Sequence, residues 1–197
     1  MQPYYQTHPI GVLYLIAVLG WYLMEVAQFL RQRQWRTDTL RISPRNYWPA
    51  FWVAMAAAAS MLFIAPRIAP AAQIGHPVVA FGIGICMVIA GVAVRGWSFE
   101  TLGRYFTFTV KVSPDQPVVT AGPYRLLRHP GYAGGLLATA GVGVMRGNWL
   151  SLATLTVATL AFIVWRVRTE ENALLATLDD RYRSYASTHK RLVPLVW

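Results

Sequence analysis

The chain has 197 residues, of which 55% are hydrophobic and only 13% are charged, whereas soluble domains average about 25% charged residues. The length suits one domain, and the composition argues against a purely water-soluble protein. The net charge of +10 would suit a nucleic-acid-binding protein. The basic residues lie between and after the apolar runs, however, so we expect membrane lipids and no nucleic acid as partners.

Three apolar runs fill the first half of the chain, at residues 10–30, 50–65 and 77–94. The first run is 21 residues long, which is enough to cross a hydrocarbon core of about 30 Å. Pro66 is expected to end the second helix, because proline lacks a backbone N–H group. Glu25 is the one charge in the first run, and it either reaches the interface or has a lipid-substrate or interhelical role. Residues 1–94 are thus predicted to form three transmembrane helices.

The second half of the chain begins with a polar segment, 95–129, which is followed by apolar runs at 130–145 and 149–165. Only three residues separate these runs, so they predict a tight helical hairpin. Sixteen residues of helix reach about 24 Å, which is short of the bilayer core. The last thirty residues predict a charged, amphipathic helix and a short tail. The chain, 1–197, is therefore predicted to be a single all-α integral membrane domain of about five transmembrane helices, including a short C-terminal helical hairpin.

The basic residues also predict an orientation. With five crossings, sixteen of the 18 Lys and Arg residues fall on one side, and only Arg67 and Arg146 fall on the other. The positive-inside rule then places the N-terminus outside and the C-terminus in the cytoplasm.

Two segments carry the densest signals for chemistry. The first, 116–132, contains three prolines, a turn-forming Gly-Pro pair, and interleaved aromatic and basic residues. The second contains Arg166 and Glu170, which are four positions apart and so share one helix face. An isolated pair of this kind is most simply a solvated salt bridge, and the functional reading depends on the context of the first segment.

Together these segments resemble the isoprenylcysteine carboxyl methyltransferase family of membrane enzymes, which are related to phospholipid N-methyltransferases. The resemblance runs from about Ser98 to the end of the chain. It rests on Leu102-Gly-Arg-Tyr-Phe-Thr107, Val119-Thr-Ala-Gly-Pro-Tyr124, Arg128-His-Pro-Gly-Tyr-Ala-Gly134, Glu170-Glu171 with Leu174, and Tyr182-x-x-Tyr185 followed by Pro194.

The resemblance implies S-adenosyl-L-methionine as the methyl donor, bound in a cytoplasmic pocket that the C-terminal segment closes. It assigns cofactor contacts to Gln116, Val119, Tyr124, His129, Tyr132 and Glu170, and it assigns Arg166 to the substrate side. The expected catalytic residues are Arg166 and Glu170. The sequence departs from the family pattern at two places. Gln116 stands where the family often has His, and Leu178-Asp179 stands where Phe-Gly usually precedes the paired tyrosines.

The chemistry of these side chains suits the implied roles. The cofactor carries a cationic sulfonium and an α-amino group, so the Glu170 carboxylate can pair with it, while tyrosine rings can stack on its base or face the cation. Arg166 can orient an acceptor carboxylate through two parallel hydrogen bonds. A carboxylate is already a nucleophile, so positioning and desolvation suffice and no general base is needed. His8, His76 and His189 lack metal-ligand spacing, and we expect no metal site.

The sequence therefore predicts a methyltransferase that acts on a lipophilic acceptor arriving from the bilayer, with the carboxylate of a prenylcysteine-like substrate as the leading choice. One alternative is a phospholipid or lipophilic-amine N-methyltransferase with the same cofactor pocket. An amine would need to lose a proton before attack, and no dedicated base stands out. A second alternative, from another class, is a non-enzymatic transporter or assembly factor.

Overall fold

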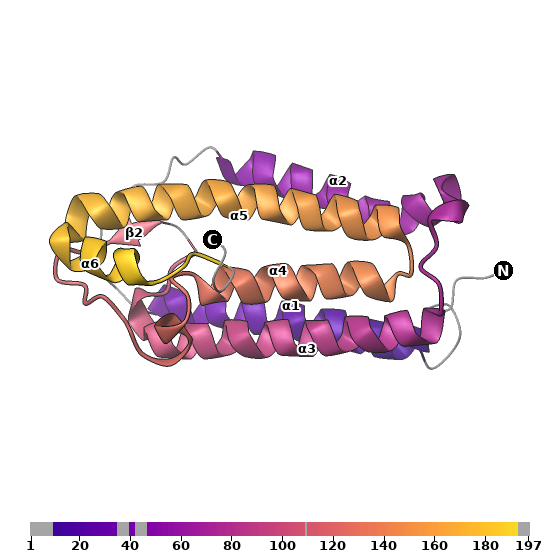
Figure 1. Cartoon of the computed structure of the whole chain (residues 1–197), viewed down its shortest axis with the longest axis horizontal. Coiled ribbons are helices and arrows are strands. Elements are labelled where there is room, and N and C mark those ends of the chain that lie inside the picture. The colour runs from indigo at the N-terminus through magenta and orange to yellow at the C-terminus, as the bar shows by residue number, and fades with distance from the viewer. Residues whose placement is uncertain (1–9, 35–39, 42–46, 109, 193–197) are drawn as a thin grey trace.

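Five long helices run side by side along one axis in the computed structural model, which describes residues 10–34, 40–41, 47–108 and 110–192 (Figure 1). The helices are α1 (Ile10–Gln34), α2 (Tyr47–Ile68), α3 (Pro77–Leu102), α4 (Pro130–Met145) and α5 (Trp149–Leu178). Within the described part of the chain, α1, α3 and α5 are long and apolar enough to cross a membrane, and the stretch Val53–Ile68 of α2 is a shorter apolar helix. The five predicted helices are thus all present.

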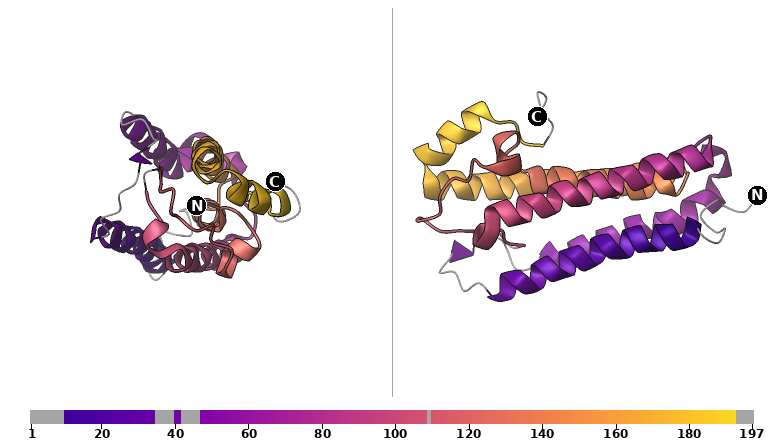
Figure 2. Two further views of the ribbon diagram at one scale, coloured as in Figure 1. Left: turned by 90° about the vertical axis from the view of Figure 1, so that its left-hand side faces the viewer. Right: turned by 90° about the horizontal axis from the view of Figure 1, so that it is seen from below.

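The remaining elements gather mainly at one end of the bundle. They are β1 (Leu40–Arg41), η2 (Pro70–Ala72), η3 (Gly103–Tyr105), β2 (Lys111–Val112), η4 (Gly122–Arg125) and α6 (Asp180–Thr188). The two short strands pair antiparallel, with Leu40 opposite Val112, and this pairing was not predicted. Helix α6 folds back beside the end of α5, on the left in Figure 1 and at the upper left in the right-hand view of Figure 2.

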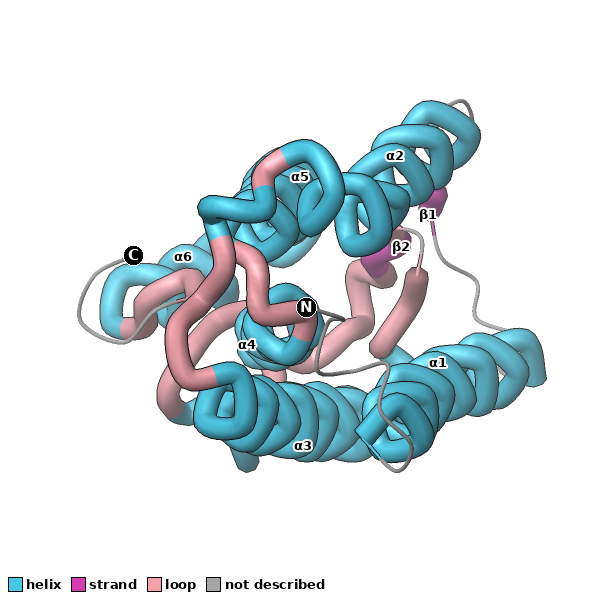
Figure 3. Tube along the Cα trace, turned by 90° about the vertical axis from the view of Figure 1, so that its right-hand side faces the viewer, coloured by secondary structure: helices cyan, strands magenta, loops and turns pink. Residues whose placement is uncertain are grey.

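Helix α4 lies in the middle of the bundle, between α3 and α5 (Figure 3). Its closest neighbour is α3, because glycines on both helices let the backbones touch. A Cβ atom on Gly91 would lie 2.5 Å from the Gly134 carbonyl oxygen, and one on Gly84 would lie 2.7 Å from the Gly141 carbonyl oxygen. Each helix presents these glycines seven residues apart, about two turns, so both contacts lie on one face.

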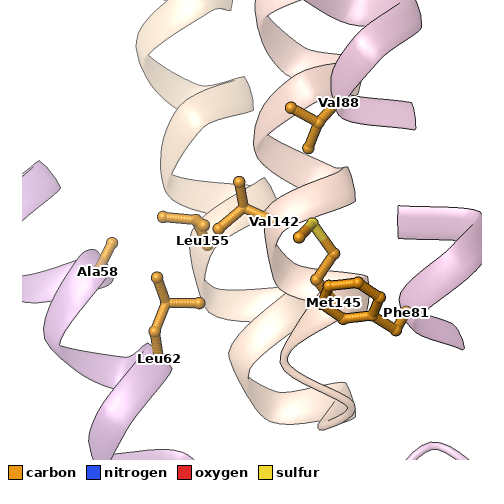
Figure 4. Close-up of a cluster of buried hydrophobic side chains, with 7 residues drawn as sticks. All are labelled: Ala58, Leu62, Phe81, Val88, Val142, Met145 and Leu155. Atoms are coloured by element: carbon orange, nitrogen blue, oxygen red, sulfur yellow. The ribbon is translucent and has the colours of Figure 1, made fainter. Parts of the chain in front are cut away.

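The apolar core fills the half of the bundle that lies away from α6. Seven buried side chains from α2, α3, α4 and α5 meet there: Ala58, Leu62, Phe81, Val88, Val142, Met145 and Leu155 (Figure 4). The first residue of α1, Ile10, packs against the same cluster. The start of α1 therefore lies at the end of the bundle opposite to α6.

Helix α2 continues through Pro66 to Ile68, so the expectation that Pro66 ends the helix was wrong. Proline cannot donate to the carbonyl of Leu62, four residues earlier. The Arg146 guanidinium takes that role, with Nε donating to the Leu62 carbonyl at 2.7 Å and the Phe63 ring 4.8 Å away. Arg146 is consequently buried, although its place between two apolar runs suggested an exposed topology signal.

Helix α3 extends to Leu102 and α5 to Leu178, well beyond the predicted ends of their apolar runs at 94 and 165. The extension of α3 contains Arg95, which pairs with Glu25 of α1. Its Nε pairs with Glu25 Oε1, and its Nη2 donates to Oε2 at 2.9 Å. Arg95 Nη1 also donates to the Gly131 carbonyl of α4 at 2.8 Å. Of the alternatives for Glu25, the interhelical role is the one that the structure contains.

Candidate active site

A pocket opens at the α6 end of the bundle, between the ends of α3, α4 and α5, the connecting segment 103–129, and α6. Its empty space is about 830 Å³ when the part open to solvent is included. All seven residues predicted for the site line this one pocket: Gln116, Val119, Tyr124, His129, Tyr132, Arg166 and Glu170. They come from two helices and a long connector, so the fold brings together residues up to 54 positions apart in the sequence.

A hydrogen-bonded trio forms one wall of the pocket. Arg166 Nε donates to the Tyr132 hydroxyl at 2.6 Å, and that hydroxyl donates to Glu170 Oε2 at 2.6 Å. Arg166 Nη2 also donates to the carbonyl of Thr107 at 3.2 Å. Arg166 and Glu170 do lie one turn apart on α5, as their spacing predicted, and Tyr132 of α4 joins them. The ring of Tyr132 is thereby held at a fixed orientation against the pocket.

The neighbouring carboxylate, Glu171, belongs to a different set of contacts. It is buried and pairs with Arg128 Nη1 at 2.7 Å, Arg191 Nε at 2.8 Å and His129 Nε2 at 3.3 Å. Successive helical residues point about 100° apart, which is why Glu170 faces the pocket while Glu171 faces the C-terminal segment. Sequence reasoning missed this cluster, although the adjacent Arg-His and Glu-Glu pairs were the available signal.

His129 lies in the pocket wall, but its ring is fixed by protein contacts. Its Nε2 faces Glu171, and its ring stacks against Tyr132 with centroids 5.6 Å apart and planes 26° apart. Its backbone N–H donates to the carbonyl of Arg191 at 3.0 Å. The residue therefore joins the C-terminal segment to the start of α4 and presents only part of its surface to a ligand.

The rest of the pocket wall is more apolar and aromatic. Tyr124 is buried, and burial raises the pKa of its hydroxyl above the usual value, with the Glu170 charge adding to the shift. Gln116 is buried too, and Val119 is half-buried. This wall can accept a flat or apolar ligand part, whereas the trio presents charge.

The C-terminal segment is held against the pocket by a sharp turn, buried tyrosines and hydrogen bonds. The chain reverses at Asp179, whose φ of 44° and ψ of −122° are unusual for a residue with a side chain. Helix α6 then packs Tyr182 and Tyr185 inward, and Arg181 donates to the carbonyl of Pro114 at 2.8 Å. The Arg128 N–H donates to the Lys190 carbonyl at 2.8 Å. The predicted single amphipathic helix is thus two elements separated by a sharp turn.

Within the described residues, no group of three His, Cys, Asp or Glu side chains could hold a metal ion. The expectation of no metal site stays a prediction.

The comparisons with known proteins agree with the resemblance drawn from the motifs. Residues 83–176 match the sequence model of the Isoprenylcysteine carboxyl methyltransferase (ICMT) family. A probable protein-S-isoprenylcysteine O-methyltransferase of Oryza sativa subsp. indica is 34% identical over 116 residues, which cover 58% of this chain and 61% of that protein. Protein-S-isoprenylcysteine O-methyltransferase A of Arabidopsis thaliana is 35% identical over 57% of this chain and 58% of its own length. The chain thus spans about three fifths of these plant relatives.

A longer alignment and a solved structure extend the similarity to the N-terminal helices. The protein-S-isoprenylcysteine O-methyltransferase of Tribolium castaneum is 26% identical over 92% of this chain and 67% of that protein. The solved eukaryotic intramembrane Ras methyltransferase ICMT superposes with a TM-score of 0.67 over 93% of this chain and 68% of that chain, at 24% identity. At this identity the structural match bears on the fold. It confirms the predicted class, an all-α integral membrane protein.

Proposed function

We propose that the chain belongs to the isoprenylcysteine carboxyl methyltransferase family, whose sequence model matches residues 83–176, and that it is an S-adenosyl-L-methionine-dependent methyltransferase. Its acceptor is the carboxylate of a lipophilic, prenylcysteine-like molecule, and its product is a methyl ester. One observation carries the proposal: the seven side chains predicted for cofactor and substrate line a single pocket. The chain acts as one unit, in which helices of 1–94 support the pocket formed by 95–197.

The residues of the pocket fit the cofactor. Glu170 presents a carboxylate oxygen to a cationic ligand and is held in place by the Tyr132 hydroxyl at 2.6 Å. The rings of Tyr124 and Tyr132 offer faces to a purine or a cation. S-adenosyl-L-methionine supplies an activated methyl group, so the protein's task is to orient an acceptor oxygen and to exclude water.

Arg166 is the residue that we assign to the acceptor. It is buried, it lies one turn closer to the middle of α5 than Glu170, and its guanidinium is oriented by Tyr132 and by the Thr107 carbonyl. A lipophilic acceptor that enters from the bilayer meets Arg166 before Glu170. A planar guanidinium held in this way suits a carboxylate.

We further propose that the pocket faces the cytoplasm and that the N-terminus lies outside. The charge distribution supports this orientation, since Arg67 and Arg146 lie at the end of the bundle opposite to α6. A reporter fused after Trp197 should then respond as cytoplasmic, and one fused before Met1 as external. Both reporters on the same side would contradict the proposal.

The cofactor assignment is tested by calorimetry with S-adenosyl-L-methionine on the purified chain. Glu170→Gln removes a charge-assisted contact of about 1.5–3 kcal/mol, so affinity should fall roughly ten- to a hundred-fold. Glu100→Gln is the matched control, because Glu100 is an exposed carboxylate on α3 outside the pocket. Equal affinity of the Glu170 variant and the control would exclude Glu170 as the contact.

A further inference from the structure

Two tyrosines three residues apart on α6 differ in the hydrogen bonding of their hydroxyl groups. Tyr182 and Tyr185 are both buried, and both line the pocket. The Tyr185 hydroxyl donates to the backbone carbonyls of Tyr124 at 2.7 Å and Leu127 at 3.2 Å. The Tyr182 hydroxyl is buried and has no hydrogen-bond partner among the residues that the structure describes. A buried hydroxyl without a partner lowers stability.

Packing alone does not account for the Tyr182 hydroxyl. The ring lies in an apolar cluster with Val110, Val112, Ala173 and Leu178, where a phenylalanine ring would bury the same carbon surface. The oxygen therefore needs a partner that comes from outside these side chains. Because Tyr182 lines the pocket, a bound ligand can supply that partner.

A second buried donor belongs to another residue that lines the pocket. Arg128 pairs through Nη1 with Glu171, but its buried Nε has no partner within the described part of the chain. Burial raises the pKa of the Tyr182 hydroxyl, the charges of Glu171 and Glu170 raise it further, and the Arg128 charge opposes them. Tyr182 thus stays protonated and donates. Both residues line the same pocket, and two such donors suit an acceptor with more than one oxygen, such as a carboxylate.

We propose that the Tyr182 hydroxyl and Arg128 Nε bind the carboxylate at the amino-acid end of the methyl donor. This inference rests on the proposed function. With Glu170 in the same pocket as a carboxylate for the cationic groups, the site offers donors and an acceptor to a zwitterion. Tyr182 then contacts the amino-acid end of the cofactor from the closing segment, and the ligand supplies a partner to two atoms that have none among the described residues.

The test compares two probes on the full chain in detergent. S-adenosylhomocysteine has the amino-acid end, and 5′-methylthioadenosine lacks it. Tyr182→Phe should weaken S-adenosylhomocysteine binding roughly ten-fold and leave 5′-methylthioadenosine binding unchanged. The melting temperature of the ligand-free variant should equal or exceed that of the wild type, because an unpaired polar atom is removed. The control, Tyr185→Phe, should lower the melting temperature, because two buried carbonyls lose their donor.

The other outcomes overturn the inference in distinguishable ways. If the wild type binds S-adenosylhomocysteine and Tyr182→Phe binds it equally well, the inference fails and the proposed function stands. Equal loss for both probes would move the contact to the nucleoside end and refute the carboxylate assignment. A melting temperature of Tyr182→Phe as low as that of Tyr185→Phe would mean that the hydroxyl has a partner within the protein. A wild type that binds neither probe would refute the proposed function and the inference with it.

Discussion

The hydroxyl of Tyr132 lies between Arg166 and Glu170, accepting a hydrogen bond from the first and donating one to the second, each at 2.6 Å. Helices α4 and α5 are therefore joined by a polar contact at the pocket, where the residue assigned to the acceptor meets the residue assigned to the cofactor. A ligand that binds Glu170 and shifts its carboxylate therefore also changes the environment of Arg166. This connection makes separate measurements of cofactor binding and turnover informative.

Tyr132→Phe should uncouple these two residues. The variant keeps the ring in the wall but removes two hydrogen bonds to charged groups, and each such bond contributes about 1.5–3 kcal/mol. We expect kcat/KM to fall by at least about ten-fold, with a smaller loss of cofactor affinity than in Glu170→Gln. Steady-state kinetics and calorimetry measure the two effects. Wild-type kinetics in a folded variant would mean that the trio has no part in turnover.

Arg166→Lys separates acceptor recognition from cofactor binding. Lysine keeps the charge but lacks the planar fork that matches a carboxylate. For a carboxylate acceptor, kcat/KM should fall by about ten-fold or more while the affinity for S-adenosylhomocysteine stays nearly unchanged. Arg168→Lys, at an exposed position of the same helix, is the control. An equal loss of cofactor affinity and turnover would mean that Arg166 only holds Glu170 through Tyr132.

Arg146→Met should destabilise the far end of the bundle. The Leu62 carbonyl, to which Pro66 cannot donate a hydrogen bond, loses its guanidinium donor in this variant. The free energy of unfolding should fall by about 1–3 kcal/mol. Pro66→Ala restores a backbone donor four residues after Leu62. In the Pro66→Ala background, Arg146→Met should lower the free energy of unfolding by clearly less than in the wild type. A double-mutant cycle measured by denaturation gives the difference. The same cost in both backgrounds would refute this account of Arg146.

Asp179→Gly should stabilise the closing segment. Asp179 has a φ of 44° and a ψ of −122°, a conformation that glycine adopts without the strain that a side chain causes. Its exposed carboxylate lies 3.5 Å from Arg183, a contact worth little in water. We expect a gain of about 1 kcal/mol in the free energy of unfolding. The control Asp180→Gly, in the first turn of α6, should instead lower the free energy of unfolding. An equal effect of the two substitutions would contradict the strain at Asp179.

The turn at Asp179 shows how far a sequence departure can be interpreted. Leu178-Asp179 differs from the usual Phe-Gly, yet the chain still makes a sharp turn here, with the aspartate in a glycine-like conformation. The helices could be predicted because hydropathy is a local property, and the residues that line the pocket were expected from the resemblance of the motifs to a known family. The pairing of Arg95 with Glu25 could not be predicted, because the two residues are 70 positions apart in the sequence.

The same limit applies to the roles of neighbouring residues. Glu170 and Glu171 are equivalent in sequence, and only the contacts of Glu171 with Arg128 and Arg191 separate them. Tyr182 and Tyr185 are likewise indistinguishable until the carbonyls of Tyr124 and Leu127 are located. Partners distant in the chain decide these roles.

The most direct test of the proposed function follows a labelled methyl group. The purified chain in lipid nanodiscs would receive S-adenosyl-L-methionine with a labelled methyl group, together with a prenylated cysteine derivative and phospholipids. The account predicts label in the prenylcysteine as an alkali-labile methyl ester, with much less in Glu170→Gln. Label found only in an alkali-stable lipid amine, or no transfer by a chain that binds the cofactor, would contradict it.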